Sequence, residues 1–166
     1  GIAPDATIMV VKVMDDGGYG GASGICSGME FSLEHGADLF NMSLGIPNAS
    51  VSAKEMLRNS CINTMQAGIA ATVAVGNEGQ LQISFPVPRN ARTPGACPPP
   101  WIHPDQESNI GGTSCCIAVG AVDFNNNHAP FSSNGPVTWE ETSFGDNPYE
   151  PGIGLIRPDV CAPGVG

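Results

Sequence analysis

The stretch Ile69-Ala-Ala-Thr-Val-Ala-Val-Gly-Asn-Glu-Gly79 decides the fold class of this chain. Its first seven residues are almost wholly apolar, a pattern typical of a strand that is buried in a sheet. The glycines that follow end the strand in a turn. In an open α/β sheet, ligands bind beyond the carboxyl ends of the strands, so Asn77 is well placed to meet one.

Strand and helix signals alternate on both sides of this stretch. Apolar runs rich in β-branched residues predict the strands, and apolar residues at helical spacing predict the helices. Ser52-Ala-Lys-Glu55 has the pattern of a capping box at the start of the second helix. Strands alternating with helices indicate an α/β domain with a parallel sheet. In chain order, the other predicted elements are a strand at 8–13, a helix at 23–36, a strand at 38–42, a helix at 52–68, and strands at 115–122 and 157–164.

Residues 80–114 interrupt the alternation. This stretch is rich in proline and has no helical or strand period. A loop of this length is uncommon inside a compact domain and is often functional.

Composition excludes some classes of partner. The 166 residues contain 16 acidic and 6 basic residues, for a net charge of −10, which argues against a nucleic-acid partner. No apolar run is long enough to cross a membrane. Charged residues make up only 13% of the chain, and 22 glycines and 15 prolines accompany them, which fits a chain with much buried surface or a part of a larger domain.

The six cysteines give no disulfide framework. No C-x-x-C pattern occurs, and Cys115 and Cys116 are adjacent, a poor geometry for mutual pairing. We expect them to be small buried hydrophobic residues rather than disulfides or metal ligands. They leave the cellular compartment undetermined.

Two interpretations of Asn77 are open from the residues alone. Its carboxamide can donate a hydrogen bond to a developing oxyanion without changing protonation state. Alternatively, Asn77 and its flanking glycines form only a turn, which is the commoner role of Gly-Asn sequences.

Six segments, in this order, resemble the subtilisin-like serine proteases, the subtilase family. The segments span most of the chain outside 80–114. They are Gly1-Ile-Ala-Pro4 with Val10-Val-Lys-Val-Met14, Asn41-Met-Ser-Leu-Gly45, Gly76-Asn-Glu-Gly79, Ile117-Ala-Val-Gly-Ala-Val-Asp123, Phe131-Ser-Ser-Asn-Gly-Pro136 and Asp159-Val-Cys-Ala-Pro-Gly164.

The resemblance implies a fold and a set of site residues. Residues 1–166 would be part of a subtilase catalytic domain, an incomplete three-layer α/β/α fold with a mostly parallel sheet and a loop or insertion at about 80–114. Ser43, Leu44 and Gly45 would line the substrate groove for a peptide or protein. Asn77 would be the oxyanion-hole donor. The wall of the primary specificity pocket would be formed by Ala74, Val75 and Gly76.

The chain departs from the family at the catalytic triad. A subtilase uses Asp, His and Ser, with the His in an H-G-T-H motif and the Ser in a G-T-S-M-A motif. By resemblance, all three positions fall outside these residues, so we expect the chain alone to be inactive. Gly112-Thr-Ser114 is similar to the serine motif, but the following Cys-Cys-Ile-Ala-Val-Gly predicts a strand, so Ser114 is expected at a strand entrance.

The remaining polar residues suggest only weak alternatives. His35 is expected to end a helix, and a triad of Ser114, His103 and Asp105 has no support from spacing. Gly17–Gly24 fails the dinucleotide fingerprint because Ser23 stands at its third glycine position. No spaced calcium-ligand loop occurs, although many subtilases use calcium, so no metal or cofactor is expected; the candidate carboxylates are Asp15, Asp16, Asp123 and Asp146.

Two further expectations concern partners. A non-catalytic domain that binds extended peptides along Asn41–Gly45 is the alternative function, with a nucleotide-binding domain weaker still. The sheet surface left uncovered in a partial domain is expected to favour self-association. Family members are often secreted, but the sequence does not set the location of this protein.

Overall fold

The computed structural model describes residues 3–102, 105, 108, 112–139, 141–143 and 154–165. Its centre is a four-stranded parallel sheet in the order β1-β2-β5-β6. A separate antiparallel pair consists of β3 (Trp101–Ile102) and β4 (Gly112–Thr113). The other elements are α1 (Ala22–Glu34), β1 (Leu39–Met42), α2 (Val51–Gln66), β2 (Ala70–Ala74), β5 (Ile117–Val122) and β6 (Val160–Pro163).

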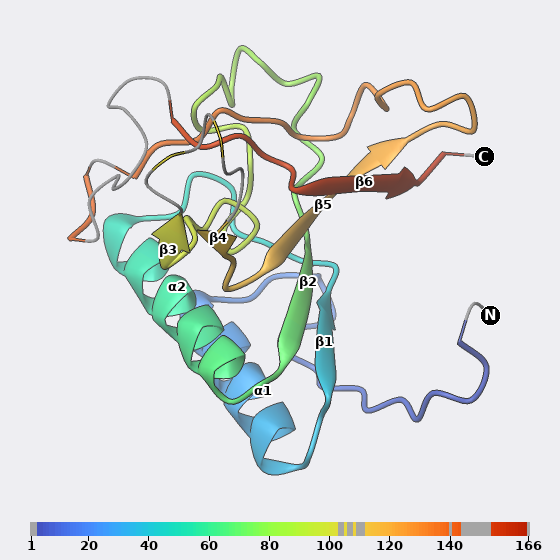
Figure 1. Cartoon of the computed structure of the whole chain (residues 1–166), viewed down its shortest axis with the longest axis vertical. Coiled ribbons are helices and arrows are strands. Elements are labelled where there is room, and N and C mark those ends of the chain that lie inside the picture. Colours follow the sequence, from blue (N-terminus) through green and yellow to red (C-terminus); the bar gives the residue numbers. More distant parts are fainter. Residues whose placement is uncertain are drawn as a thin grey trace.

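The predicted α/β class with a mostly parallel sheet is confirmed. Figure 1 shows α1 and α2 on the same side of the sheet. Their buried side chains share one core with the sheet, because alternate residues of β1 and β2 point toward the helices. The second helical layer of the expected α/β/α arrangement is not among the described residues. The centre of the core consists of Ile25, Met29, Phe40, Met42, Leu57, Cys61, Ala71 and Val73.

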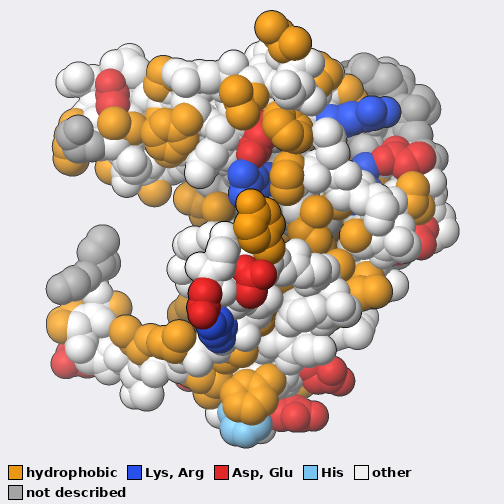
Figure 2. All heavy atoms as spheres, turned by 180° about the vertical axis from the view of Figure 1, so that it is seen from behind, with side chains coloured by type: hydrophobic (Ala, Val, Ile, Leu, Met, Phe, Trp, Pro, Cys, Tyr) orange, Lys and Arg blue, Asp and Glu red, His pale blue; other side chains and the backbone are white. Residues whose placement is uncertain are grey.

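The prediction of a strand at 8–13 is wrong. In the structure these residues pair with no strand of the described sheet, and Ile8 and Val10 are 81% and 87% exposed. Only the end of the segment joins the core, where Val13 occupies the space that a Cβ on Gly28 would need. Figure 2 shows the N-terminal stretch projecting from the body as an arm with a recess above it. An apolar run has strand propensity, but it becomes a strand only where a neighbour completes its hydrogen bonds.

The predicted capping box is also wrong in position. The N-cap of α2 is Ser50, whose Oγ accepts the backbone N–H of Ala53 at 3.3 Å. Ser52 lies in the first turn. The carboxylate of Glu55 accepts the N–H of Ser143 instead of returning to the helix start.

The proline-rich stretch contributes to the interior. Residues 90–99 are buried except for the half-buried Arg92. They pack beside the ends of β1 and β2, and two hydrogen bonds between Ile46 and Thr93 join them to the segment that follows β1. This stretch therefore forms part of the surface on which the candidate site is built.

Among the described residues, no helix combines the length and apolar character needed to cross a bilayer.

Candidate functional site

The turn after β2 presents Asn77 to solvent. Gly76 precedes it with φ +123°, a conformation that side chains rarely adopt, and is buried. The side chain of Asn77 makes no hydrogen bond to another described residue, and the residue is exposed. Its carboxamide is therefore available to a ligand at the carboxyl end of the sheet.

Glu78 holds this turn in place although the sequence analysis assigned it no role. Its carboxylate accepts the N–H of Asn77 at 2.9 Å and the hydroxyl of Ser133 at 3.2 Å. Ser133 Oγ in turn accepts the N–H of Glu78 at 2.9 Å, and the N–H of Ser133 donates to the carbonyl of Gly76 at 3.0 Å. The backbone on both sides of Asn77 is thus fixed from a segment far away in the sequence.

Asn90 supports the turn from the other side. It is 1% exposed, and its Nδ2 donates to the carbonyls of Glu78 and Phe85, both at 2.7 Å. Its Oδ1 accepts the N–H of Asn134 at 3.0 Å. All the polar atoms of this buried amide side chain are satisfied by backbone groups, as a rigid turn requires.

An ion pair between Arg92 and the buried Glu78 completes the turn. Arg92 Nε donates to both oxygens of Glu78 at 2.9 and 3.0 Å, and Nη2 donates to Oε1. The side chain of Glu78 is 5% exposed, whereas that of Arg92 is 31% exposed. Burial opposes ionisation of Glu78, but the hydrogen bonds and the charge of Arg92, with the Asn77 N–H and the Ser133 hydroxyl, outweigh it and lower the pKa of Glu78.

The predicted groove lining and the predicted pocket wall each bring one glycine, Gly45 and Gly76, against the side chain of Arg92. Ser43, Leu44 and Gly45 directly follow β1. Ala74 is the last residue of β2, and Val75 and Gly76 follow it. Ser43 is exposed, and its hydroxyl accepts from Asn41 Nδ2 at 3.3 Å. Leu44 and Gly45 are half-buried, as is Ala74, while Val75 is 1% exposed.

Backbone contacts hold the segment around Arg92 beside Ala74 and Val75. The N–H of Arg92 donates to the carbonyl of Val75 at 2.8 Å. Gly95 lies so near Ala74 that a Cβ on Gly95 would be 2.8 Å from the Ala74 carbonyl oxygen. Sequence reasoning missed Arg92 and Glu78 as site residues. The adjacency of Glu78 to Asn77 was one available signal, but no local pattern marks Arg92.

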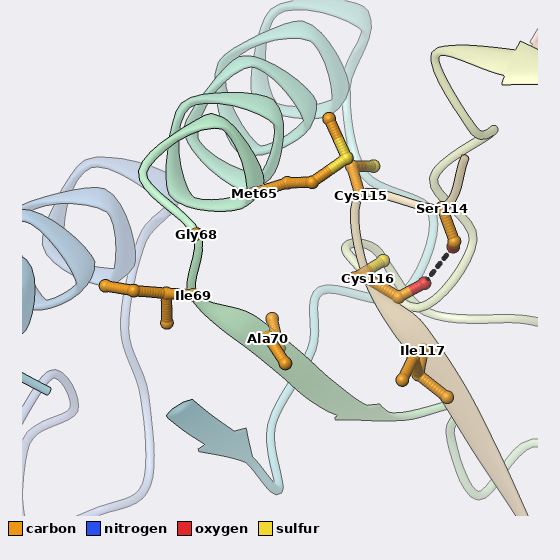
Figure 3. A pocket seen from close by; sticks show the side chains of 9 residues that line it. Met65, Gly68, Ile69, Ala70, Ser114, Cys115, Cys116 and Ile117 are labelled. Carbon is orange, nitrogen blue, oxygen red and sulfur yellow. Dashed lines mark hydrogen bonds between the residues drawn. The ribbon is translucent and has the colours of Figure 1, made fainter. Parts of the chain in front are cut away.

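Ser114 lies near the entrance of a strand, as predicted. It directly follows β4 and stands three residues before the start of β5, and its hydroxyl donates to the carbonyl of Cys116, the contact drawn as a dashed line in Figure 3. The surrounding pocket is lined mainly by apolar side chains and cysteines at the amino ends of β2 and β5. Asn77 follows the carboxyl end of β2, so Ser114 and Asn77 lie at opposite ends of the sheet.

The histidines that the structure describes have structural partners. His35 is the C-cap residue of α1, as expected; its Nδ1 lies 2.7 Å from the carbonyl of Phe31, and the two rings stack. His128 forms a bridge with Val122. His103 lies outside the described residues.

The candidate carboxylates shape local turns. Asp15 accepts the N–H groups of Gly17 and Tyr19, each at 2.9 Å. Asp123 accepts those of Asn125 and Asn127, and its pKa is lowered chiefly by the side chain of Asn127. Asp16 pairs with Lys12, and Asp146 lies outside the described residues.

The glycine-rich turn at 17–24 also lacks the setting of a dinucleotide site. That fingerprint requires a strand directly before the turn, and the described residues before α1 form none.

Comparisons with known proteins identify the family and the fold. The model of the subtilase family, peptidase S8, matches residues 1–166. Subtilisin E of Bacillus subtilis (strain 168) is 33% identical over 135 residues, which cover 81% of this chain and 29% of that protein. Subtilisin DY of Bacillus licheniformis is 32% identical over 139 residues, covering 81% and 40%. The chain thus spans well under half the length of these relatives.

Solved structures show the same fold at lower sequence identity. The crystal structure of a lanthipeptide protease matches with a TM-score of 0.61 and 20% identity, over 94% of this chain and 42% of that one. A prenylagaramide maturation protease matches with a TM-score of 0.53 and 19% identity, over 73% and 35%. With the family model covering every residue, the conclusion is that this chain belongs to the subtilase family.

Proposed function

We propose that this chain is part of the catalytic domain of a serine endopeptidase that hydrolyses peptide bonds through an acyl-enzyme. The observation that carries the proposal is the turn at Asn77, which leaves the carboxamide unengaged while buried partners fix the backbone on both sides. The relatives named as subtilisins and as an alkaline protease support the same reaction class.

Asn77 acts as the oxyanion-hole donor. During acyl transfer the carbonyl oxygen of the substrate gains negative charge, and a donor that is already in place stabilises it without reorganisation. The hydrogen bonds from Glu78, Ser133 and Asn90 support this role, because they hold the turn on which Asn77 is mounted.

The substrate is an extended peptide or protein segment. Ser43, Leu44 and Gly45 would line its groove, and Ala74, Val75 and Gly76 would form one wall of the pocket for the side chain next to the scissile bond. The position of these segments at the carboxyl ends of β1 and β2 supports the assignment.

The Asp, His and Ser of the triad are supplied by sequence outside these 166 residues, and the chain alone is inactive. Neither the H-G-T-H nor the G-T-S-M-A motif stands in the sequence. Ser114 is engaged with a backbone carbonyl at the opposite end of the sheet from Asn77. No cofactor is assigned a step in this scheme.

Replacing Asn77 in the full-length protein tests the proposal. Asn77→Ala should lower kcat by about 10²–10³-fold with little change in KM; this magnitude is the one known for the same donor in subtilisin rather than a result of this structure. Asn48→Ala, at another exposed asparagine, is the matched control and should leave kcat unchanged. Equal rates for Asn77→Ala and the native protein would contradict the assignment.

A second candidate function is a non-catalytic module that binds extended peptides. The supporting observation is that β1 is an edge strand of the described sheet, so its outer hydrogen-bonding groups suit strand addition along Asn41–Gly45. This candidate predicts peptide binding by the full-length protein without covalent labelling by an active-serine probe, whereas the endopeptidase is labelled.

When separated from the rest of the protein, the chain associates with itself through the open face of the sheet. Leu39, Ile117 and Val160 lie on this face and are 62%, 37% and 50% exposed. Contiguous apolar surface of this kind favours association. A strictly monomeric chain in sedimentation at micromolar concentration would count against it.

A further inference from the structure

The aliphatic stem of Arg92 lies against Gly45 of the proposed groove lining and Gly76 of the proposed pocket wall. A Cβ on Gly45 would lie 2.7 Å from Arg92 Cβ and 3.3 Å from its Cδ, and a Cβ on Gly76 would lie 2.9 Å from its Cγ. Both glycines therefore contact the same side chain. Because neither glycine carries a Cβ, the methylene groups of Arg92 occupy the space that side chains at these two positions would need.

The guanidinium head of Arg92 is only partly used. A guanidinium carries five N–H donors. Glu78 takes those of Nε and one on Nη2, and no other described residue accepts from Nη1. The Arg92 side chain is 31% exposed while that of Glu78 is 5% exposed, so the arginine is the more solvent-accessible member of the pair.

Glu78 fixes where this head lies. Its second oxygen is held by the N–H of Asn77 and the hydroxyl of Ser133, so the carboxylate cannot turn away from Arg92 without losing both contacts. The guanidinium is therefore anchored on Glu78, the residue that follows Asn77, and the stem lies against Gly76 of the proposed pocket wall.

We propose that Arg92 determines the specificity of this pocket, selecting substrates with an acidic side chain on the residue before the scissile bond. The inference rests on the proposed endopeptidase function and names its substrate class. The stem occupies space beside Gly45 and Gly76 that a large apolar side chain would need. The remaining N–H donors match a carboxylate in geometry and charge, and they repel a basic side chain. Glu78 competes for the same guanidinium, so it weakens the preference without removing it.

A series of peptides that differ only at this residue tests the inference in the full-length protein. With Glu, Gln, Phe and Lys compared, the native protein should cleave the Glu peptide at least about tenfold faster in kcat/KM than the Gln peptide, a ratio that corresponds to one charged contact. The Phe and Lys peptides should be slower still.

Variants at the ion pair separate its two effects. Arg92→Gln keeps most of the stem and removes the charge, so the preference for Glu over Gln should vanish while the Phe peptide stays poor. Arg92→Ala removes the stem and should raise cleavage of the Phe peptide. Glu78→Gln removes the competing carboxylate and should increase the preference for Glu. Arg89→Gln, at a neighbouring base, is the matched control and should leave the profile unchanged.

The outcomes distinguish this inference from the function on which it rests. Cleavage of these peptides with a preference that Arg92→Gln does not alter would overturn the role of Arg92 alone. Failure of the native protein to cleave any peptide would refute the endopeptidase proposal itself. If Arg92→Gln does not fold, Arg92→Lys and Glu78→Gln decide: the first should weaken the preference for Glu and the second should strengthen it, and unchanged profiles in both overturn the inference.

Discussion

The two ends of the parallel sheet are built from different chemistry. At the carboxyl end, the turn after β2 carries Asn77 and the buried Glu78, and Arg92 and Ser133 bond to that carboxylate. At the amino end, a pocket of about 270 Å³ lies at the starts of β2 and β5 (Figure 3). Its lining includes Met65, Ile69, Cys115 and Cys116. Only the carboxyl end combines buried charge with an exposed, unengaged amide among the described residues.

This difference shows what a site needs from the fold. At the carboxyl end, the long stretch after β2 returns to supply Asn90 and Arg92, and the segment after β5 supplies Ser133, so each buried polar group finds a partner. At the amino end, α2 connects to β2 through a short turn at Gly68, and mainly apolar side chains and cysteines line the pocket. Polar chemistry is retained where distant segments converge to satisfy it.

Placing a charge at the amino end should have the largest effect. Cys116 is 2% exposed, and its Sγ lies 3.4 Å from the carbonyl of Pro94. Cys116→Asp places a carboxylate among buried thiols and apolar side chains, so we expect a loss of about 4 kcal/mol or more in the free energy of unfolding. Denaturant unfolding of the protein measures it.

Cys116→Ser is the control for that substitution. Its hydroxyl can donate to Pro94 as the thiol does, so the loss should be about 1 kcal/mol. If the aspartate variant were as stable as the serine variant, the amino end would tolerate charge as well as the carboxyl end, and the comparison would fail.

Matched glycine substitutions at the two ends should differ next most. Gly76 and Gly68 both have positive φ, at +123° and +85°. A Cβ at Gly76 would lie 2.7 Å from both Glu78 Oε2 and Ser133 Oγ, whereas nothing lies within 4 Å at Gly68. We expect Gly76→Ala to cost about 3 kcal/mol and Gly68→Ala about 1 kcal/mol. Equal losses would show that crowding at the turn after β2 has no energetic weight.

The pH dependence of stability should give the smallest effect. Because the pKa of Glu78 is lowered by folding from its ordinary 4.5, its contribution is fully present above pH 4.5 and is lost as the pH falls through the folded value. Glu78→Gln should cost about 1–2 kcal/mol at pH 7, since the partly exposed Arg92 remains hydrated. The difference between the two proteins should shrink toward pH 3. A difference that is constant from pH 7 to pH 3 would contradict the ionised pair.

Much of the fold could be predicted because it follows local periodicity. The apolar runs at 38–42, 69–75 and 115–122 contain the three strands β1, β2 and β5, and the helical spacing of Leu57 and Cys61 marks the buried face of α2. The run at 8–13 has the same pattern but no strand partner in the structure. Strand propensity is a local property, whereas strand formation depends on a neighbour.

The candidate site divides in the same way. Asn77 and the groove segments at 43–45 and 74–76 are found from motifs that lie next to predicted strands. Glu78 and Arg92 are separated by 14 positions, and Ser133 lies 55 positions from Glu78. No pattern in the intervening sequence predicts that these three side chains come into contact.

By itself, the sequence determined the two helices, the four strands of the parallel sheet and the family, and it placed Asn77 directly after a strand, because periodicity and short motifs act over a few residues. Only the tertiary structure decided that Arg92 lies against Gly45 and Gly76 and that Glu78 is buried against it. The path of the proline-rich stretch sets those contacts. That path depends on which distant groups form hydrogen bonds with its buried backbone, and on the space that Gly45 and Gly76 leave open because they have no side chains.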